Sequence, residues 1–128
     1  MHTQITSGVK VSVEVVYQSE YSNPAKMHFM FSYQITIENL SDSTIQLMNR
    51  HWDIFDAIGE FKQVEGEGVV GEQPILIPGA VYQYASGCNL KSEMGYMEGY
   101  YEMITELDGS TFQVKIPRFN LISTFKLN

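Results

Sequence analysis

The sequence predicts an all-β domain, folded as an antiparallel sandwich of about seven or eight strands. Apolar residues, many of them β-branched or aromatic, alternate with polar ones in several short segments, which is the period of a half-buried strand. Glycine, proline and asparagine interrupt these segments, and none has the length and period of a helix. Such spacing indicates a sandwich or a small barrel, and we favour the sandwich.

Three strands are expected in the first half of the chain. Residues 9–15 alternate valine with polar residues, and 29–38 form the clearest alternating segment after a Ser-, Asn- and Pro-containing loop. A third strand begins at Ile45 and runs towards Asp56. His2, ahead of the first strand, is expected to lie in a frayed terminus.

The second half of the chain contains shorter strands. Residues 61–64 and 81–85 are each expected to be a strand, and between them lie the Gly-rich stretch and the proline-bounded 75–77. Gly95 and Gly99 argue against a helix in the segment that follows. Asp108-Gly109 is a strong hairpin signal, so 96–106 and 111–117 are predicted to pair.

Length, charge and cysteine content restrict the class of protein. The 128 residues suit one domain, spanning 1–128, and the single Cys88 rules out an internal disulfide. The polar start of the chain and the lack of a long apolar run favour a cytoplasmic protein. A net charge of −7 with scattered cations argues against nucleic-acid and membrane partners.

Residues 66–71 match the G-x-G-x-x-G dinucleotide fingerprint, but Pro74 and Pro78 leave no room for the helix that this fingerprint requires. Two interpretations stay open for Gly66, Gly68 and Gly71. They form either a tight loop with positive φ angles or a nest of backbone amides that binds an anion. Three nearby acids, Glu65, Glu67 and Glu72, would repel a phosphate.

The same acids, with His51, Asp53 and Asp56, form a candidate divalent-cation site. Carboxylates suit Mg²⁺ or Ca²⁺, and imidazole suits Co²⁺ or Zn²⁺. On a strand His51 and Asp53 share one face and Trp52 takes the other, but two ligands do not close a site. The metal prediction therefore rests on His51, Asp53, Glu65 and Glu67, and no cofactor is required.

No catalytic set is expected. Cys88 with His51 or His28 is the available Cys–His pairing, and a lone cysteine is more commonly a buried structural thiol. Tyrosines and methionines gather in the second half, where they either pack the sheets or form a recognition surface. An exposed sheet edge is a further possible docking feature.

Several motifs together resemble the bacterial ApaG family, also known as CorD. They are 49–52 (NRHW), 64–74 (VEGEGVVGEQP), 78–79 (PG), 82–87 (YQYASG), 95–99 (GYMEG) and 116–119 (IPRF), with Tyr101, Met103, Asp108-Gly109, Phe112 and Val114 between the last two. One departure lies at Ser92-Glu93, where the family more often has Thr-Pro.

The resemblance implies an immunoglobulin-like or fibronectin type III-like sandwich and a link to cobalt resistance and magnesium efflux. Related domains in F-box proteins and in a polymerase-delta-interacting protein look like interaction modules. The resemblance supplies no catalytic residue. We therefore expect a non-enzymatic module that binds a protein partner. Formation of a homo-oligomer stays open. The alternative is a small-ligand site at the Gly-rich stretch.

Overall fold

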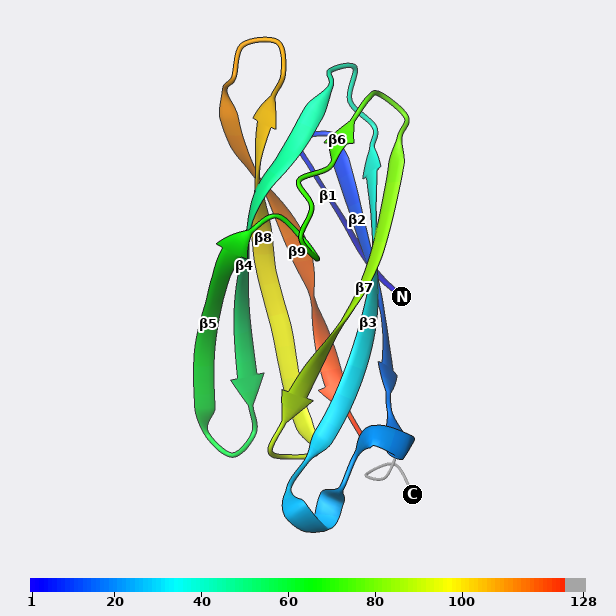
Figure 1. Ribbon diagram of the computed structural model, residues 1–128, viewed down its shortest axis with the longest axis vertical. Helices are drawn as coiled ribbons and strands as arrows, with labels where there is room; N and C mark the ends of the chain where they lie inside the picture. The colour runs from blue at the N-terminus through cyan, green and yellow to red at the C-terminus, as the bar shows by residue number, and fades with distance from the viewer. Residues whose placement is uncertain (124–128) are drawn as a thin grey trace.

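The computed structural model describes residues 1–123 and has two antiparallel sheets packed face to face (Figure 1). One sheet has the order β1-β2-β3-β7, and the other has the order β5-β4-β8-β9, with β6 paired to β4. The strands are β1 (His2–Thr6), β2 (Val9–Tyr17), β3 (Phe29–Asn39), β4 (Ile45–Asp56), β5 (Glu60–Glu67), β6 (Ile75–Leu76), β7 (Val81–Leu90), β8 (Met94–Thr105) and β9 (Thr111–Ile122). The predicted all-β sandwich is confirmed.

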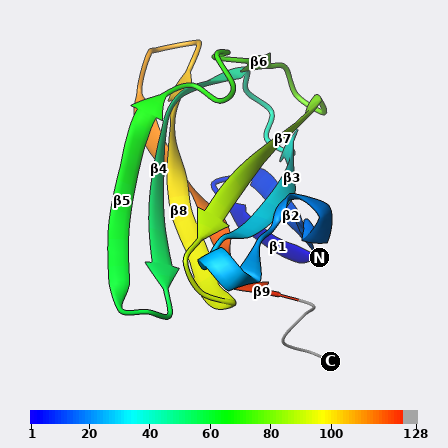
Figure 2. The same ribbon diagram turned by 60° about the horizontal axis from the view of Figure 1, so that its bottom comes forward.

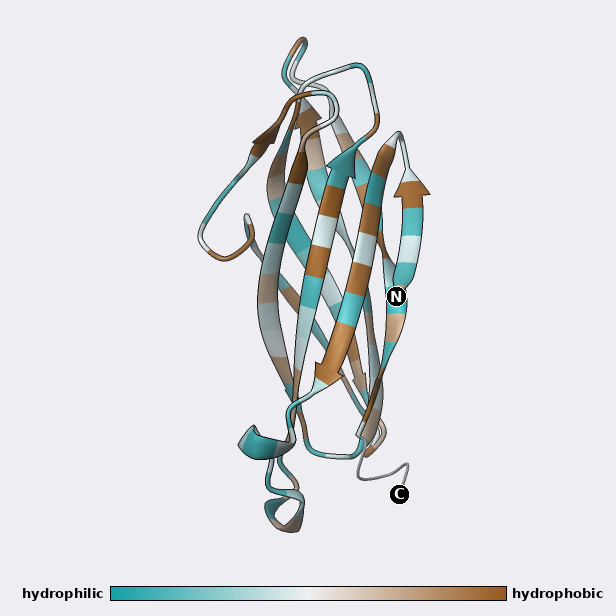
Figure 3. Cartoon of the chain, turned by 90° about the vertical axis from the view of Figure 1, so that its right-hand side faces the viewer, coloured by the Kyte–Doolittle hydropathy of each residue, from teal (hydrophilic) through white to brown (hydrophobic). Residues whose placement is uncertain are grey.

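Alternation in the sequence becomes alternation across the sheets. In β3, residues at odd positions from Phe29 to Asn39 are buried and the intervening ones are exposed or half-buried. Figure 3 shows the same hydrophobic and hydrophilic bands along the strands. Because successive side chains point to opposite faces, each strand gives one face to the core. Phe119 of β9 lies in the core between the sheets. Its ring contacts Tyr33 of β3 in the four-stranded sheet and Trp52 of β4 in its own sheet.

Several strand boundaries differ from the sequence prediction. The structure has nine strands in residues 1–123, because the segment expected to fray forms β1, in which His2 pairs with Val13. Strand β5 extends through Gly66 to Glu67 and does not end at residue 64. The predicted end of the domain at residue 128 lies outside the described part of the chain.

Strand β9 also continues beyond its predicted end at Pro117. The register with β8 changes between the pair Met97–Phe119 and the pair Gly99–Ile116, which places Pro117 in a bulge. A proline has no amide hydrogen to donate, and a bulge is a position where the ladder does not need one. The predicted pairing around Asp108-Gly109 is confirmed, with Ile104 opposite Thr111.

The two long sides of the sandwich differ. On one side β9 packs against β1 and β2 of the other sheet. On the other side β5 and β7 end their sheets, and each pairs with one neighbour (Figure 2). This second side, which we call the open side, therefore has two strand edges without a partner strand in residues 1–123. No helix within residues 1–123 is long and apolar enough to cross a membrane.

Candidate functional site

The Gly-rich stretch ends in a tight turn at residues 69–72. Val69 and Glu72 exchange both backbone hydrogen bonds, at 2.8 and 2.9 Å. Val70 (φ 48°) and Gly71 (φ 79°), the two residues between them, have positive φ angles, as a type I′ turn requires. Val69 itself is fully buried in the core. The turn thus fixes a core side chain in place.

Gly66 and Gly68 lie where neighbouring groups approach closely, an arginine side chain at Gly66 and backbone at Gly68. A Cβ on Gly66 would lie 2.6 Å from Nη2 of Arg50, and one on Gly68 would collide with the carbonyl oxygen of Glu72. Nη1 of Arg50 donates to the carbonyls of Glu67 (3.0 Å) and Gly68 (2.9 Å). The amides of Gly68, Val69 and Glu72 donate to backbone carbonyls of the fold. Gly68 and Gly71 therefore have a backbone reason to be glycine, and Gly66 leaves room for the Arg50 guanidinium.

Val70 is the strained residue of this turn. A β-branched residue at positive φ costs about 1 kcal/mol or more, whereas asparagine is favoured there. Since the Val70 side chain is 65% exposed, little packing is lost with it. We expect Val70→Asn to raise the free energy of unfolding by about 1 kcal/mol in urea denaturation.

The matched control is Val16→Asn, an exposed valine in β2. It loses β-propensity without relieving a turn, so it is expected to be neutral or slightly destabilising. Equal effects of the two substitutions would contradict the assignment of strain to Val70.

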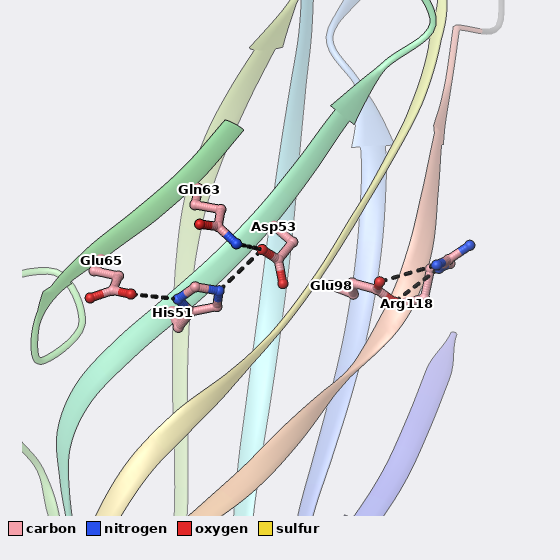
Figure 4. A network of polar contacts seen from close by, with 6 residues as sticks. All are labelled: His51, Asp53, Gln63, Glu65, Glu98 and Arg118. Atoms are coloured by element: carbon pink, nitrogen blue, oxygen red, sulfur yellow. Dashed lines mark hydrogen bonds and ion pairs between the residues drawn. The ribbon is translucent and has the colours of Figure 1, made fainter. Parts of the chain in front are cut away.

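A polar network covers the outer face of the five-stranded sheet. His51 lies beside Glu65 of β5 and Asp53 of its own strand, with Nδ1 3.0 Å from Glu65 Oε1 and Nε2 3.1 Å from Asp53 Oδ1. Gln63 donates to the same Asp53 oxygen at 3.0 Å. The His51 ring stacks on Tyr100 of β8, with centroids 4.7 Å apart. Figure 4 shows His51 with Asp53, Gln63 and Glu65, beside the Glu98–Arg118 ion pair.

The network lines a shallow depression of about 530 Å³. Its walls are Asn49, Arg50, His51, Glu65, Gly66, Glu67, Tyr100 and Glu102. Three of the four candidate metal ligands, His51, Glu65 and Glu67, line the depression, and Asp53 adjoins it through His51. In residues 1–123 no group of three or more His, Cys, Asp or Glu side chains is arranged to hold a metal ion.

Both ring nitrogens of His51 face carboxylate oxygens, and a ring that donates from both nitrogens is the charged imidazolium. Burial lowers the pKa of His51, but the hydrogen bonds to Glu65 and Asp53 outweigh it, so the pKa is raised above its ordinary value of 6.5. A metal ion at His51 would have to displace a carboxylate and a proton. The metal prediction and the small-ligand prediction for Gly66, Gly68 and Gly71 stay predictions.

The raised pKa of His51 makes its contribution to stability depend on pH. The contribution is complete below the ordinary value and is lost as the pH rises through the folded value. Asp53 and Glu65 supply the facing charges, and Tyr100 stacks on the ring. We expect His51→Gln to lower the melting temperature more at about pH 6 than at about pH 9.

Thermal unfolding of both proteins across this range measures the difference. His28→Gln, which removes an exposed imidazole, is the matched control. A His51→Gln penalty that does not grow at low pH would contradict the charged state of His51.

The predicted Cys–His pairing is not assembled. Cys88 lies on the inner face of the four-stranded sheet, buried among core residues, whereas His51 lies on the outer face of the other sheet. Burial raises the pKa of the Cys88 thiol to about 11, which keeps it protonated. His28 lies exposed in the turn before β3. These residues do not form one site.

The open side contains a groove of about 380 Å³ between the two free edges. Strand β5 contributes Lys62 and Val64, strand β7 contributes Ser86 to Asn89, and the floor comes from core residues of other strands. The rest of the lining is Arg50 and four core residues, Tyr33, Trp52, Ile54 and Met97. The groove therefore joins an apolar floor to backbone edges on both walls.

Sequence reasoning identified His51, Asp53 and Glu65 but missed Gln63 and Tyr100. Tyr100 and Gln63 enter the network because β8 and β5 pair with β4 in one particular register. Arg50 was missed as the residue that binds the Gly-rich stretch, although it stands directly opposite Gly66. Nothing local in the sequence marks these cross-strand contacts.

Comparison with known proteins gives one family. The sequence profile described as the ApaG domain matches residues 19–105. Protein ApaG of Brucella suis biovar 1 is 46% identical over 121 residues, which cover 94% of this chain and 92% of that protein. Protein ApaG of Paramagnetospirillum magneticum is 46% identical over 123 residues, which cover 96% and 94%.

Two solved structures have the same fold as this chain and are similar to it in sequence. The crystal structure of a putative ApaA protein from Bordetella pertussis superposes with a TM-score of 0.86 at 37% identity and covers 94% of each chain. An X-ray structure from a structural genomics consortium superposes with a TM-score of 0.87 at 38% identity and covers 95% of this chain and 92% of the other.

Proposed function

The chain belongs to the ApaG domain family, and from this premise we propose that it is a non-enzymatic module that binds a protein partner. The observation that carries the proposal is the open side, where β5 and β7 leave two strand edges unpaired beside one groove. Unpaired edges offer backbone donors and acceptors to another chain, and this is a common mode of peptide recognition.

The cation link implied by the family resemblance fits an indirect role. His51, the best candidate ligand for a soft divalent cation, has both ring nitrogens bound to carboxylates. We propose that an effect on cobalt resistance or magnesium efflux arises through the bound partner. Binding to a partner is also the simplest way in which a small β-sandwich protein would alter cation transport carried out by another protein.

Capture from a native bacterial lysate on the immobilised chain tests the proposed function. We expect at least one protein whose capture saturates and is competed by the free chain. A screen in which no protein shows saturable, competed capture would contradict the proposal. The same material reports whether the chain is monomeric, through its sedimentation behaviour.

Small-ligand binding is the weaker candidate. Arg50 is the cation at the Gly-rich stretch, but its Nη1 already binds two backbone carbonyls there. Titration calorimetry with pyrophosphate, Mg²⁺ and Co²⁺ decides this point. Saturable heat from pyrophosphate that is lost in Arg50→Gln, or saturable heat from either cation, would favour this candidate over the interaction module.

A further inference from the structure

Strand β7 is the less protected of the two edges on the open side. Its ten residues, Val81–Leu90, include no charged side chain and no proline. Natural edge strands usually carry such residues because they block pairing with other chains. Strand β5 has four charged residues in eight, among them Lys62. The β7 edge is therefore the natural template for an added strand.

The middle of β7 is also the accessible part. Ala85, Ser86 and Gly87 are consecutive exposed residues, although side chains of a strand alternate between the two faces. Ser86 faces inward, opposite Tyr33, and is nevertheless exposed because the groove opens there. A strand added at this point would place alternate side chains over the groove floor.

The charges of the groove select its occupant. Arg50 and Lys62 line it without any carboxylate, in a chain with fifteen acidic and eight basic residues. Neither cation forms an ion pair with another residue of the described segment 1–123. By contrast, Lys91 and Arg118 do form ion pairs, with Glu60 and Glu98. The groove thus presents unneutralised positive charge beside an apolar floor.

We propose that an extended, acidic segment of a partner protein adds to the edge of β7 and places a carboxylate beside Lys62. This proposal rests on the proposed function and names the class of partner. A second copy of the chain fits less well, because a β7 edge brings no carboxylate to the two cations. Strand addition supplies backbone hydrogen bonds, and the alternating side chains supply specificity.

Selection from a displayed library of random peptides of about ten residues, the length of an edge strand, tests the proposal on the full chain. We expect the selected peptides to be rich in β-formers and to contain an acidic residue. Each is then synthesised, and its affinity is measured for the wild type and for two groove variants, Lys62→Glu and Ser86→Glu. Both sites are exposed, so both variants are expected to fold.

The expected loss is about tenfold for either groove variant, because each introduces a like charge beside the peptide carboxylate. Lys115→Glu is the matched control, since it makes the same charge change at an exposed site on β9, outside the groove. Its affinity is expected to stay within about twofold of the wild type. Hydrogen exchange with bound peptide is expected to protect amides between Ala85 and Asn89.

Four results would overturn the proposal: failure to select any peptide, selection of peptides without acidic residues, equal losses in Lys62→Glu and Lys115→Glu, or protection confined to β5. Concentration-dependent dimerisation that protects β7 without peptide would assign the edge to a second copy. If the lysate partner binds Lys62→Glu as tightly as the wild type, the β7 proposal fails and the interaction function stands. If nothing is captured saturably, the interaction function itself fails.

Discussion

Gly99→Ala is expected to lower the free energy of unfolding by about 3 kcal/mol or more, at the upper end of overpacking effects. Gly99 stands opposite Trp52 where β8 pairs with β4, next to the β8–β9 bulge. A Cβ there would collide with the carbonyl oxygen of His51 and would lie 3.1 Å from Cα of Trp52. Backbone atoms cannot rotate away, so the two strands must separate.

Urea denaturation monitored by Trp52 fluorescence measures this effect. Gly109→Ala is the matched control, because Gly109 has φ 69° and open space around its Cα, so alanine costs only the left-handed backbone penalty of about 1 kcal/mol. Similar penalties for the two variants would contradict the role of close backbone approach at Gly99. The His51–Tyr100 stack should also loosen in Gly99→Ala, since Tyr100 is its chain neighbour.

Phe119→Ala is expected to cost about 3–5 kcal/mol, the usual penalty for removing a buried aromatic ring. Phe119 is fully buried and contacts Tyr33 of one sheet and Trp52 of the other, with ring centroids 5.6 and 5.9 Å away. Its removal leaves a cavity between the sheets that neither ring can fill without leaving its own place. Loss of near-ultraviolet circular dichroism is expected to accompany the lower stability.

Phe61→Ala provides the comparison, because Phe61 is 55% exposed on the edge strand β5. Its cost is expected to be about 0.5 kcal/mol or less. If both substitutions lower the free energy of unfolding equally, packing of Phe119 between the sheets does not stabilise the fold more than an exposed edge residue does.

The sequence predicted those parts of the fold that have local causes. Alternation identified β2, β3 and β4, and Asp108-Gly109 identified the β8–β9 hairpin. The prediction failed where tertiary pairing overrides a local rule. Pro117 does not end β9 because a bulge absorbs it, and His2 does not fray because β2 offers it a partner. Neither the bulge nor the partner is visible within a few residues of sequence.

In the candidate site, too, some contacts follow from the local sequence and others depend on how the strands pair. The period of a strand was enough to place His51 and Asp53 on one face, and the structure joins them by a hydrogen bond. Glu65 meets His51 only because β5 pairs with β4 in that register. The role of Arg50 at the Gly-rich stretch also depends on the register. A one-residue slip would have moved every one of these side chains to the opposite face.

The uncharged edge of β7 affects the solubility of the protein at high concentration. A concentrated solution brings such edges into contact, and edge-to-edge pairing is the first step towards insoluble assemblies. The net charge of −7 keeps molecules apart by mutual repulsion, and dissolved salt weakens that repulsion. Aggregation is therefore expected to become faster as ionic strength and protein concentration rise together. A partner strand bound to β7 would slow it by covering the edge.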